Sequence, residues 1–163
     1  MPLTADLSAF FFAELAALAS LTGFVVVAIS INLTRILAFA TLPGRAVEAL
    51  IAPVGAITAT SLVLIPEQPS WLLGSEIFAI GLVMVFAPAA IQARAWRERK
   101  DAPARERVVR TATSAGLGLA FLVGGAVLAA GGRAGLFWIA GGDVLSLIAI
   151  VFSAWVLMVE ILR

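Results

Sequence analysis

The chain has 163 residues, of which 62% are hydrophobic and 13% charged, and its mean hydropathy is +1.08. Soluble globular domains are nearer ~45–50% apolar, so this composition excludes an ordinary soluble domain and indicates a protein solvated by lipid. Cysteine and histidine are absent, which excludes disulfides, Cys or His metal sites and catalysis by a Cys nucleophile or a His base. We therefore expect no metal and no cofactor, and with a net charge of only +1 we expect no nucleic-acid partner.

Five apolar segments are each long enough to cross a hydrocarbon core of ~30 Å, which takes ~20 helical residues. The first runs from about residue 7 to residue 37, and no Lys or Arg precedes Arg35. The basic start of a cleavable signal peptide is therefore missing, and we expect this helix to be retained. Short turns and one charged connection separate the other expected helices, which cover about 46–65, 71–96, 108–130 and 136–162. The sequence predicts an all-α fold, a five-helix transmembrane bundle forming one domain over residues 1–163.

The basic residues predict how this bundle is oriented. Seven of the eleven lie from Arg94 to Arg110, in the connection between the third and fourth helices and the helix ends beside it. Cytoplasmic loops are enriched in Lys and Arg, so we expect the N-terminus outside and the C-terminus inside, with Arg133 as the one external basic residue. The same 94–110 loop is a candidate site for anionic lipid, although its charge is equally well explained by topology alone.

Two helical hairpins share a sequence pattern, which suggests a tandem repeat. Trp71-Leu-Leu-Gly-Ser-Glu76 and Trp138-Ile-Ala-Gly-Gly-Asp143 match at identical spacing, and each opens an outside-to-inside helix. Helices two and three would then correspond to helices four and five. The alternative is that Ala-rich and Gly-rich apolar helices resemble one another without any repeat.

Three carboxyl groups, those of Glu14, Glu76 and Asp143, are expected at similar depths, one to two turns below the outer surface. If they converge, they form an acidic outer vestibule that binds protons or small cations. Alternatively, they lie in the first turns of outward-pointing helices, where the helix dipole favours a negative charge.

Other polar and small residues recur at helical spacing. Three sets were identified: Ser146, Ser153 and Glu160 as a polar lining, Asn32, Arg35 and Glu48 as a cytoplasmic-end cluster, and Gly116, Ala120 and Gly124 as a helix-packing ladder. Polar contacts between membrane helices commonly fix packing, and small residues let helix backbones approach closely. Structural roles are therefore the simpler interpretation of all three sets.

The segments 21–37, 42–48 and 64–68, which read LTGFVVVAISINLTRIL, LPGRAVE and LIPEQ, carry a resemblance to known proteins. With them the chain resembles a group of small uncharacterised bacterial multi-pass inner-membrane proteins. The resemblance covers the first two helices. It implies a location in the bacterial plasma (inner) membrane and implies no activity.

The polar intramembrane residues favour a small channel or transporter for protons or small cations. We expect it to be a homo-oligomer, because five helices enclose little space alone. The alternative is a non-catalytic accessory subunit that packs against a larger membrane complex. Enzymatic activity is not expected, since Asp143 lacks the partner Asp of an aspartyl protease and no His or Cys is present.

Overall fold

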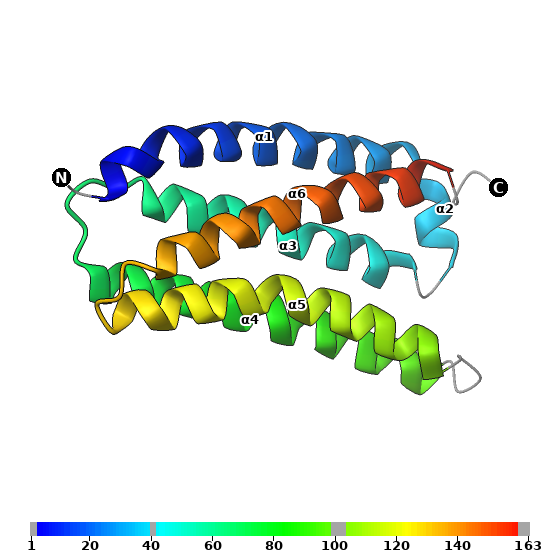
Figure 1. Cartoon of the computed structure of the whole chain (residues 1–163). Coiled ribbons are helices and arrows are strands. Elements are labelled where there is room, and N and C mark those ends of the chain that lie inside the picture. The colour runs from blue at the N-terminus through cyan, green and yellow to red at the C-terminus, as the bar shows by residue number, and fades with distance from the viewer. Residues whose placement is uncertain (1–2, 40–41, 99–103, 160–163) are drawn as a thin grey trace.

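The computed structural model describes residues 3–39, 42–98 and 104–159, and these residues form helices joined by short turns, with no strand among them (Figure 1). The helices are α1 (Leu3–Ile31), α2 (Leu33–Ala38), α3 (Leu42–Val63), α4 (Ser70–Glu98), α5 (Ala104–Ala129) and α6 (Gly135–Val159). The all-α prediction is confirmed.

Five of these helices are long and apolar enough to cross a membrane. The spans are Leu7–Ile31, Leu42–Val63, Ser70–Arg97, Thr111–Ala129 and Gly135–Met158. Large apolar side chains such as Phe24, Phe86 and Phe152 are 60–65% exposed, which water would disfavour and lipid accommodates. This is the architecture of a multi-pass membrane protein.

The first expected helix differs from the structure because it is interrupted at Asn32. The side-chain Nδ2 of Asn32 donates to the Ala28 carbonyl oxygen at 2.9 Å. The backbone N–H of Asn32 donates to the same oxygen over a longer distance, 3.3 Å. An Asn side chain that competes for a helix carbonyl weakens the regular helix. The chain therefore ends α1 at Ile31 and continues as the short helix α2.

The bundle consists of two groups of helices (Figure 1). Helices α4 and α5 form the closest pair, whereas α1, α3 and α6 contact one another. Helix α3 also packs against α4, and α6 also packs against α5, but within the described residues α4 contacts neither α1 nor α6. Side chains on α1 and α4 are thus kept apart by the fold.

Glycine makes the close approach of α4 and α5 possible. A Cβ atom added at Gly74 would lie 2.2 Å from the backbone nitrogen of Ala129, and one added at Gly125 would lie 2.5 Å from that of Phe78. Gly81 faces α5 just as closely, seven residues after Gly74. Small residues at this spacing bring two membrane helices into backbone contact.

The predicted Gly116, Ala120 and Gly124 ladder packs only in part. A Cβ atom added at Gly124 would lie 2.9 Å from the side chain of Ile139 on α6. Ala120 lies against Gly142, which is also on α6. Gly116 has nothing within 4 Å of its Cβ position, because α6 has moved away from α5 at that level. Ala120 and Gly124 therefore pack within the chain, and a packing role for Gly116 stays a prediction.

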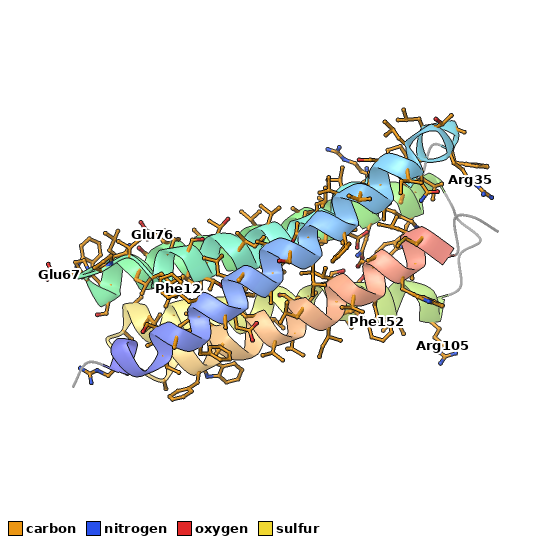
Figure 2. All side chains as sticks on the ribbon, turned by 90° about the horizontal axis from the view of Figure 1, so that it is seen from above. Phe12, Arg35, Glu67, Glu76, Arg105 and Phe152 are labelled. Atoms are coloured by element: carbon orange, nitrogen blue, oxygen red, sulfur yellow. The ribbon has the colours of Figure 1, made fainter. Side chains whose placement is uncertain are left out.

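The two ends of the bundle differ in charge. One end, called here the basic end, carries Arg35, Arg45, Arg94 and Arg105, while Glu67 and Glu76 lie toward the opposite end (Figure 2). Trp71 and Trp138, the residues on which the suggested repeat is based, are exposed near the starts of α4 and α6. The repeat itself stays a prediction.

Candidate functional site

Asp143 on α6 is completely buried, and only one of its two carboxyl oxygens has a partner. Its Oδ2 atom accepts a hydrogen bond of 2.9 Å from the hydroxyl of Thr60 on α3. Its Oδ1 atom, also buried, has no hydrogen-bond partner among the described residues. An ionisable group in this state within a membrane span is costly and usually functional.

The Thr60 hydroxyl has two acceptors for a single proton. It lies 2.8 Å from the Ala56 carbonyl and 2.9 Å from Asp143 Oδ2. A hydroxyl donates one hydrogen bond and accepts others, so it can donate to an ionised Asp143, or donate to Ala56 while accepting from a protonated one. The pair therefore accommodates both protonation states of Asp143 without moving a heavy atom.

Two further polar groups near Asp143 lack partners. Glu14 on α1 has a buried Oε2 atom with no hydrogen bond in the described chain, and its carboxyl group interacts electrostatically with that of Asp143. Ser146, three residues beyond Asp143, is completely buried and its Oγ makes no hydrogen bond to any described residue. Serines elsewhere in these helices, such as Ser20 and Ser61, donate to the carbonyl four residues earlier. The Ser146 hydroxyl is thus unusual in remaining available to a ligand.

We call Glu14, Thr60, Asp143 and Ser146 the Asp143 site. Its residues come from α1, α3 and α6, the three helices that contact one another. Buried polar groups in native proteins are normally hydrogen-bonded, and each exception needs an explanation. Three unpaired oxygen atoms in one part of a membrane core indicate a place for a proton or a small polar ligand. No group of three or more acidic side chains suited to a metal ion occurs in residues 3–39, 42–98 and 104–159.

Apolar side chains close the Asp143 site toward both ends of the bundle. Toward the end opposite the basic one, Ile139 precedes Asp143 by four residues and Phe11 precedes Glu14 by three, and both are fully buried. Toward the basic end, Leu18 follows Glu14 by four residues and Ile150 follows Asp143 by seven, and both are equally buried. Residues three, four or seven apart share a helix face, so these side chains lie above and below the site. Asp143 and Ser146 are therefore enclosed by the bundle, whereas Glu14 is half-buried.

Glu76 is separate from this site. It lies on α4, which touches neither α1 nor α6, and its carboxylate accepts a hydrogen bond from Gln68. The expected vestibule of three carboxyl groups is thus reduced to Glu14 and Asp143. The similar depth along the bundle stays a prediction from the sequence, which does not give the position of each helix around the bundle.

A second buried polar cluster, near the basic end, was missed by the sequence analysis. Gln92 of α4 is completely buried, and its Nε2 donates to Glu48 of α3 and, at 3.0 Å, to Ser114 of α5. The Thr111 hydroxyl donates to Gln92 Oε1 at 3.0 Å. Gln92 is an amide that directly follows the apolar stretch 77–91 of α4, and this was the signal that could have revealed it.

The predicted cytoplasmic-end cluster does not form as one unit. Asn32 donates to the carbonyls of Ala28 and Leu157, so it joins α1 to α6. Glu48 instead belongs to the Gln92 cluster, and Arg35 is exposed. Asn32 and Glu48 have different partners, Leu157 of α6 and Gln92 of α4, and this explains the difference.

A cavity of about 1070 Å³ occupies the half of the bundle nearest the basic end. It lies between α3, α5 and α6 and includes Arg35 of α2. Ser153 of the predicted polar lining contributes to its wall, whereas Ser146 lies in the Asp143 site. Glu160, the third member of that lining, lies outside the described residues.

The cavity ends close to the Asp143 site. Its lining includes Leu145 of α6, two residues after Asp143, and Pro53 of α3, seven residues before Thr60. Two residues of α-helix span about 3 Å along the helix axis. The cavity therefore reaches almost to the level of Asp143, although neither Asp143 nor Thr60 is among its lining residues.

No protein family, curated protein or solved structure matches this chain. We therefore infer its function from the chemistry of the Asp143 site and the cavity.

Proposed function

We propose that the protein is a small transporter that carries protons or small monovalent cations across the bacterial plasma membrane, with Asp143 as its central binding group. The observation that supports this most strongly is the state of Asp143, which is fully buried in a membrane span with one oxygen held by Thr60 and the other unpaired. Ionisable residues inside membrane proteins commonly mark ion or proton pathways, because membrane burial without a function is costly.

A proton suits the geometry of the site best among these ions. The Thr60 hydroxyl offers hydrogen bonding to both protonation states of Asp143. The nearby carboxyl group of Glu14 gives a second proton acceptor, and the Ser146 hydroxyl is free to relay a hydrogen bond. The proton would thus bind and leave with only small changes in side-chain position at the site.

The cavity supports a carrier mechanism with alternating access. We place the basic end in the cytoplasm, because this orientation puts ten of the eleven basic residues inside. The cavity then lies in the cytoplasmic half of the bundle and reaches Leu145, two residues from Asp143, whereas Asp143 itself is not among its lining residues. Small movements of α6 against α3 would connect the two, as in transporters whose helices rock around a central site.

Each chain would carry its own site, because all four residues of the Asp143 site belong to one copy. A homo-oligomer remains part of the proposal, since small membrane bundles commonly assemble symmetrically.

The test is a flux assay on purified protein in liposomes that contain a pH-sensitive dye, with proton, sodium and potassium gradients applied separately. Asp143→Asn preserves the shape of the side chain and its acceptor for Thr60 but removes the exchangeable proton. We expect it to abolish flux. Glu67→Gln is the matched control, because Glu67 is an exposed carboxylate in the connection between α3 and α4. We expect this variant to transport like the wild type.

The variant Glu76→Gln distinguishes the Asp143 site from the vestibule of three carboxyl groups that the sequence suggests. The structure predicts normal flux for this variant, whereas a shared vestibule predicts a loss. Flux in Asp143→Asn equal to that of the wild type would refute the proposal. No flux above empty liposomes for the wild type would also refute it and would favour the accessory-subunit alternative.

A further inference from the structure

We propose that the cavity near the basic end is a binding site for an anionic glycerophospholipid, with one acyl chain inserted between α5 and α6 and the phosphate held by Arg35 and Arg45. This inference does not depend on the transport proposal, and it assigns to the acyl chain only the laterally open part of the cavity between α5 and α6. It also differs from the candidate lipid site at the 94–110 loop, because the residues that carry it lie on α2, α3, α5 and α6.

The cavity exists because α5 and α6 pack closely only over half of their length. Near the end opposite the basic one, a Cβ atom at Gly135 would lie 2.4 Å from the Gly124 carbonyl oxygen, and Gly142 lies against Phe121. Toward the basic end the contact is lost, and the space at Gly116 is open. Figure 1 shows α6 passing from α5 to α1 along its length. The two helices thus form a wedge that widens toward the basic end.

The walls of this wedge are mainly apolar and open to the side, and Thr113, Ser114 and Ser153 are the hydroxyl side chains among them. Leu145, Ile148 and Phe152 line it from α6 and are 48–65% exposed, and Leu117 lines it from α5. The volume of about 1070 Å³ is at the upper end of the ~300–1,000 Å³ typical of small-molecule sites. In a bilayer, hydrocarbon from the adjacent leaflet is the ligand that matches such walls.

The mouth of the cavity has the opposite chemistry. Arg35 of α2 and Arg45 at the start of α3 both line it, at the level where the bundle becomes basic. Arginine binds phosphate through paired N–H donors, and basic residues next to a membrane surface attract anionic headgroups. Glu48 also lines the cavity, where it accepts hydrogen bonds from Gln92 and Ser114, so two arginines and one carboxyl group leave a net positive charge. Mainly apolar walls below this positive charge match a phospholipid with a negatively charged headgroup. A water-soluble anion would match the mouth but not the walls.

Gly116 supplies a variant that blocks the wedge without disturbing the packing. Because its Cβ position is empty to 4 Å and Gly116 lines the cavity, Gly116→Leu would place a side chain in the path of the acyl chain. Gly23→Leu is the matched control. Gly23 also has open space around its Cβ position and lies on α1, outside the cavity.

The experiment is native mass spectrometry of the purified protein with defined lipids added from detergent: phosphatidylglycerol, phosphatidylcholine, lysophosphatidylglycerol and glycerol phosphate. We expect each protein chain to bind one molecule of phosphatidylglycerol in preference to phosphatidylcholine. Lysophosphatidylglycerol should compete with phosphatidylglycerol for this site. Glycerol phosphate, which has the anionic group and no chain, should not compete. Competition by glycerol phosphate would instead identify a site for a soluble anion and overturn the proposal.

The variants test the chain and the head separately. Gly116→Leu should weaken phosphatidylglycerol binding about tenfold or more, and Gly23→Leu should bind like the wild type. Replacing both Arg35 and Arg45 with Gln should reduce the preference for phosphatidylglycerol about thirtyfold, since each basic residue near the headgroups contributes about fivefold. Equal binding by the Gly116→Leu and Gly23→Leu variants, or an unchanged headgroup preference in the double variant, would overturn the proposal. Thermal unfolding of every variant confirms that it is folded.

Discussion

The backbone contact between α4 and α5 predicts a large effect from the smallest possible side chain. In Gly74→Ala the new Cβ atom would lie 2.2 Å from the Ala129 nitrogen and 2.7 Å from the Gly125 carbonyl oxygen. Ordinary van der Waals contact begins at 3.4 Å. Because the neighbouring atoms are backbone and not flexible side chains, the helices must separate locally by the difference, 3.4 minus 2.2, or 1.2 Å.

The free-energy cost follows from this separation. A gap of ~0.5–1 Å removes a quarter to a half of the dispersion attraction between each pair of facing atoms, and overpacking costs about 1–3 kcal/mol. Because the clash in Gly74→Ala is with backbone atoms, we take the upper end of this overpacking cost, ~3 kcal/mol. Alanine regains about 1 kcal/mol through its higher helix propensity. We therefore expect a net loss of about 2 kcal/mol in the free energy of unfolding.

The assay is thermal and denaturant unfolding in detergent, followed by circular dichroism, with Gly116→Ala as the matched control. Gly116 is in the same pair of helices but has open space around its Cβ position. Gly116→Ala should therefore be stabilised by about 0.5–1 kcal/mol. If Gly74→Ala proved as stable as Gly116→Ala, the close approach of α4 and α5 through glycine would be refuted.

Three further predictions concern buried polar groups and use the same unfolding assay. Asn32→Ala removes the hydrogen bond to the Leu157 carbonyl and should cost about 0.6–1.7 kcal/mol, the range for polar contacts between membrane helices; no loss would mean that Asn32 does not hold α1 to α6. Gln92→Leu deprives Glu48 of a buried hydrogen-bond donor and should cost about 1–3 kcal/mol, whereas a more stable variant would contradict a structural role for this cluster. Asp143→Asn should be at least as stable as the wild type, because it removes an ionisable group whose Oδ1 atom has no described partner. A clear loss of stability in this variant would indicate that Asp143 is kept for folding and not for function.

The sequence alone determined the fold class and the number of membrane spans. Each span is an uninterrupted apolar stretch of sufficient length, and in lipid a helix must satisfy its own backbone hydrogen bonds, so local composition is enough to identify it. The similar depth expected for Glu14, Glu76 and Asp143 uses only the distance of each residue from a helix end, and it stays a prediction.

Only the tertiary structure decided which of these residues meet. The rotation of each helix and its neighbours depend on packing between helices, and a nearly uniform apolar sequence contains little information about it. Thus Asp143 bonds to Thr60 because α6 packs against α3, and it lies within electrostatic range of Glu14 because α6 also packs against α1, whereas Glu76 lies apart on α4. The same packing, which is close between α5 and α6 at one end and open at Gly116, creates the cavity that no local pattern predicted.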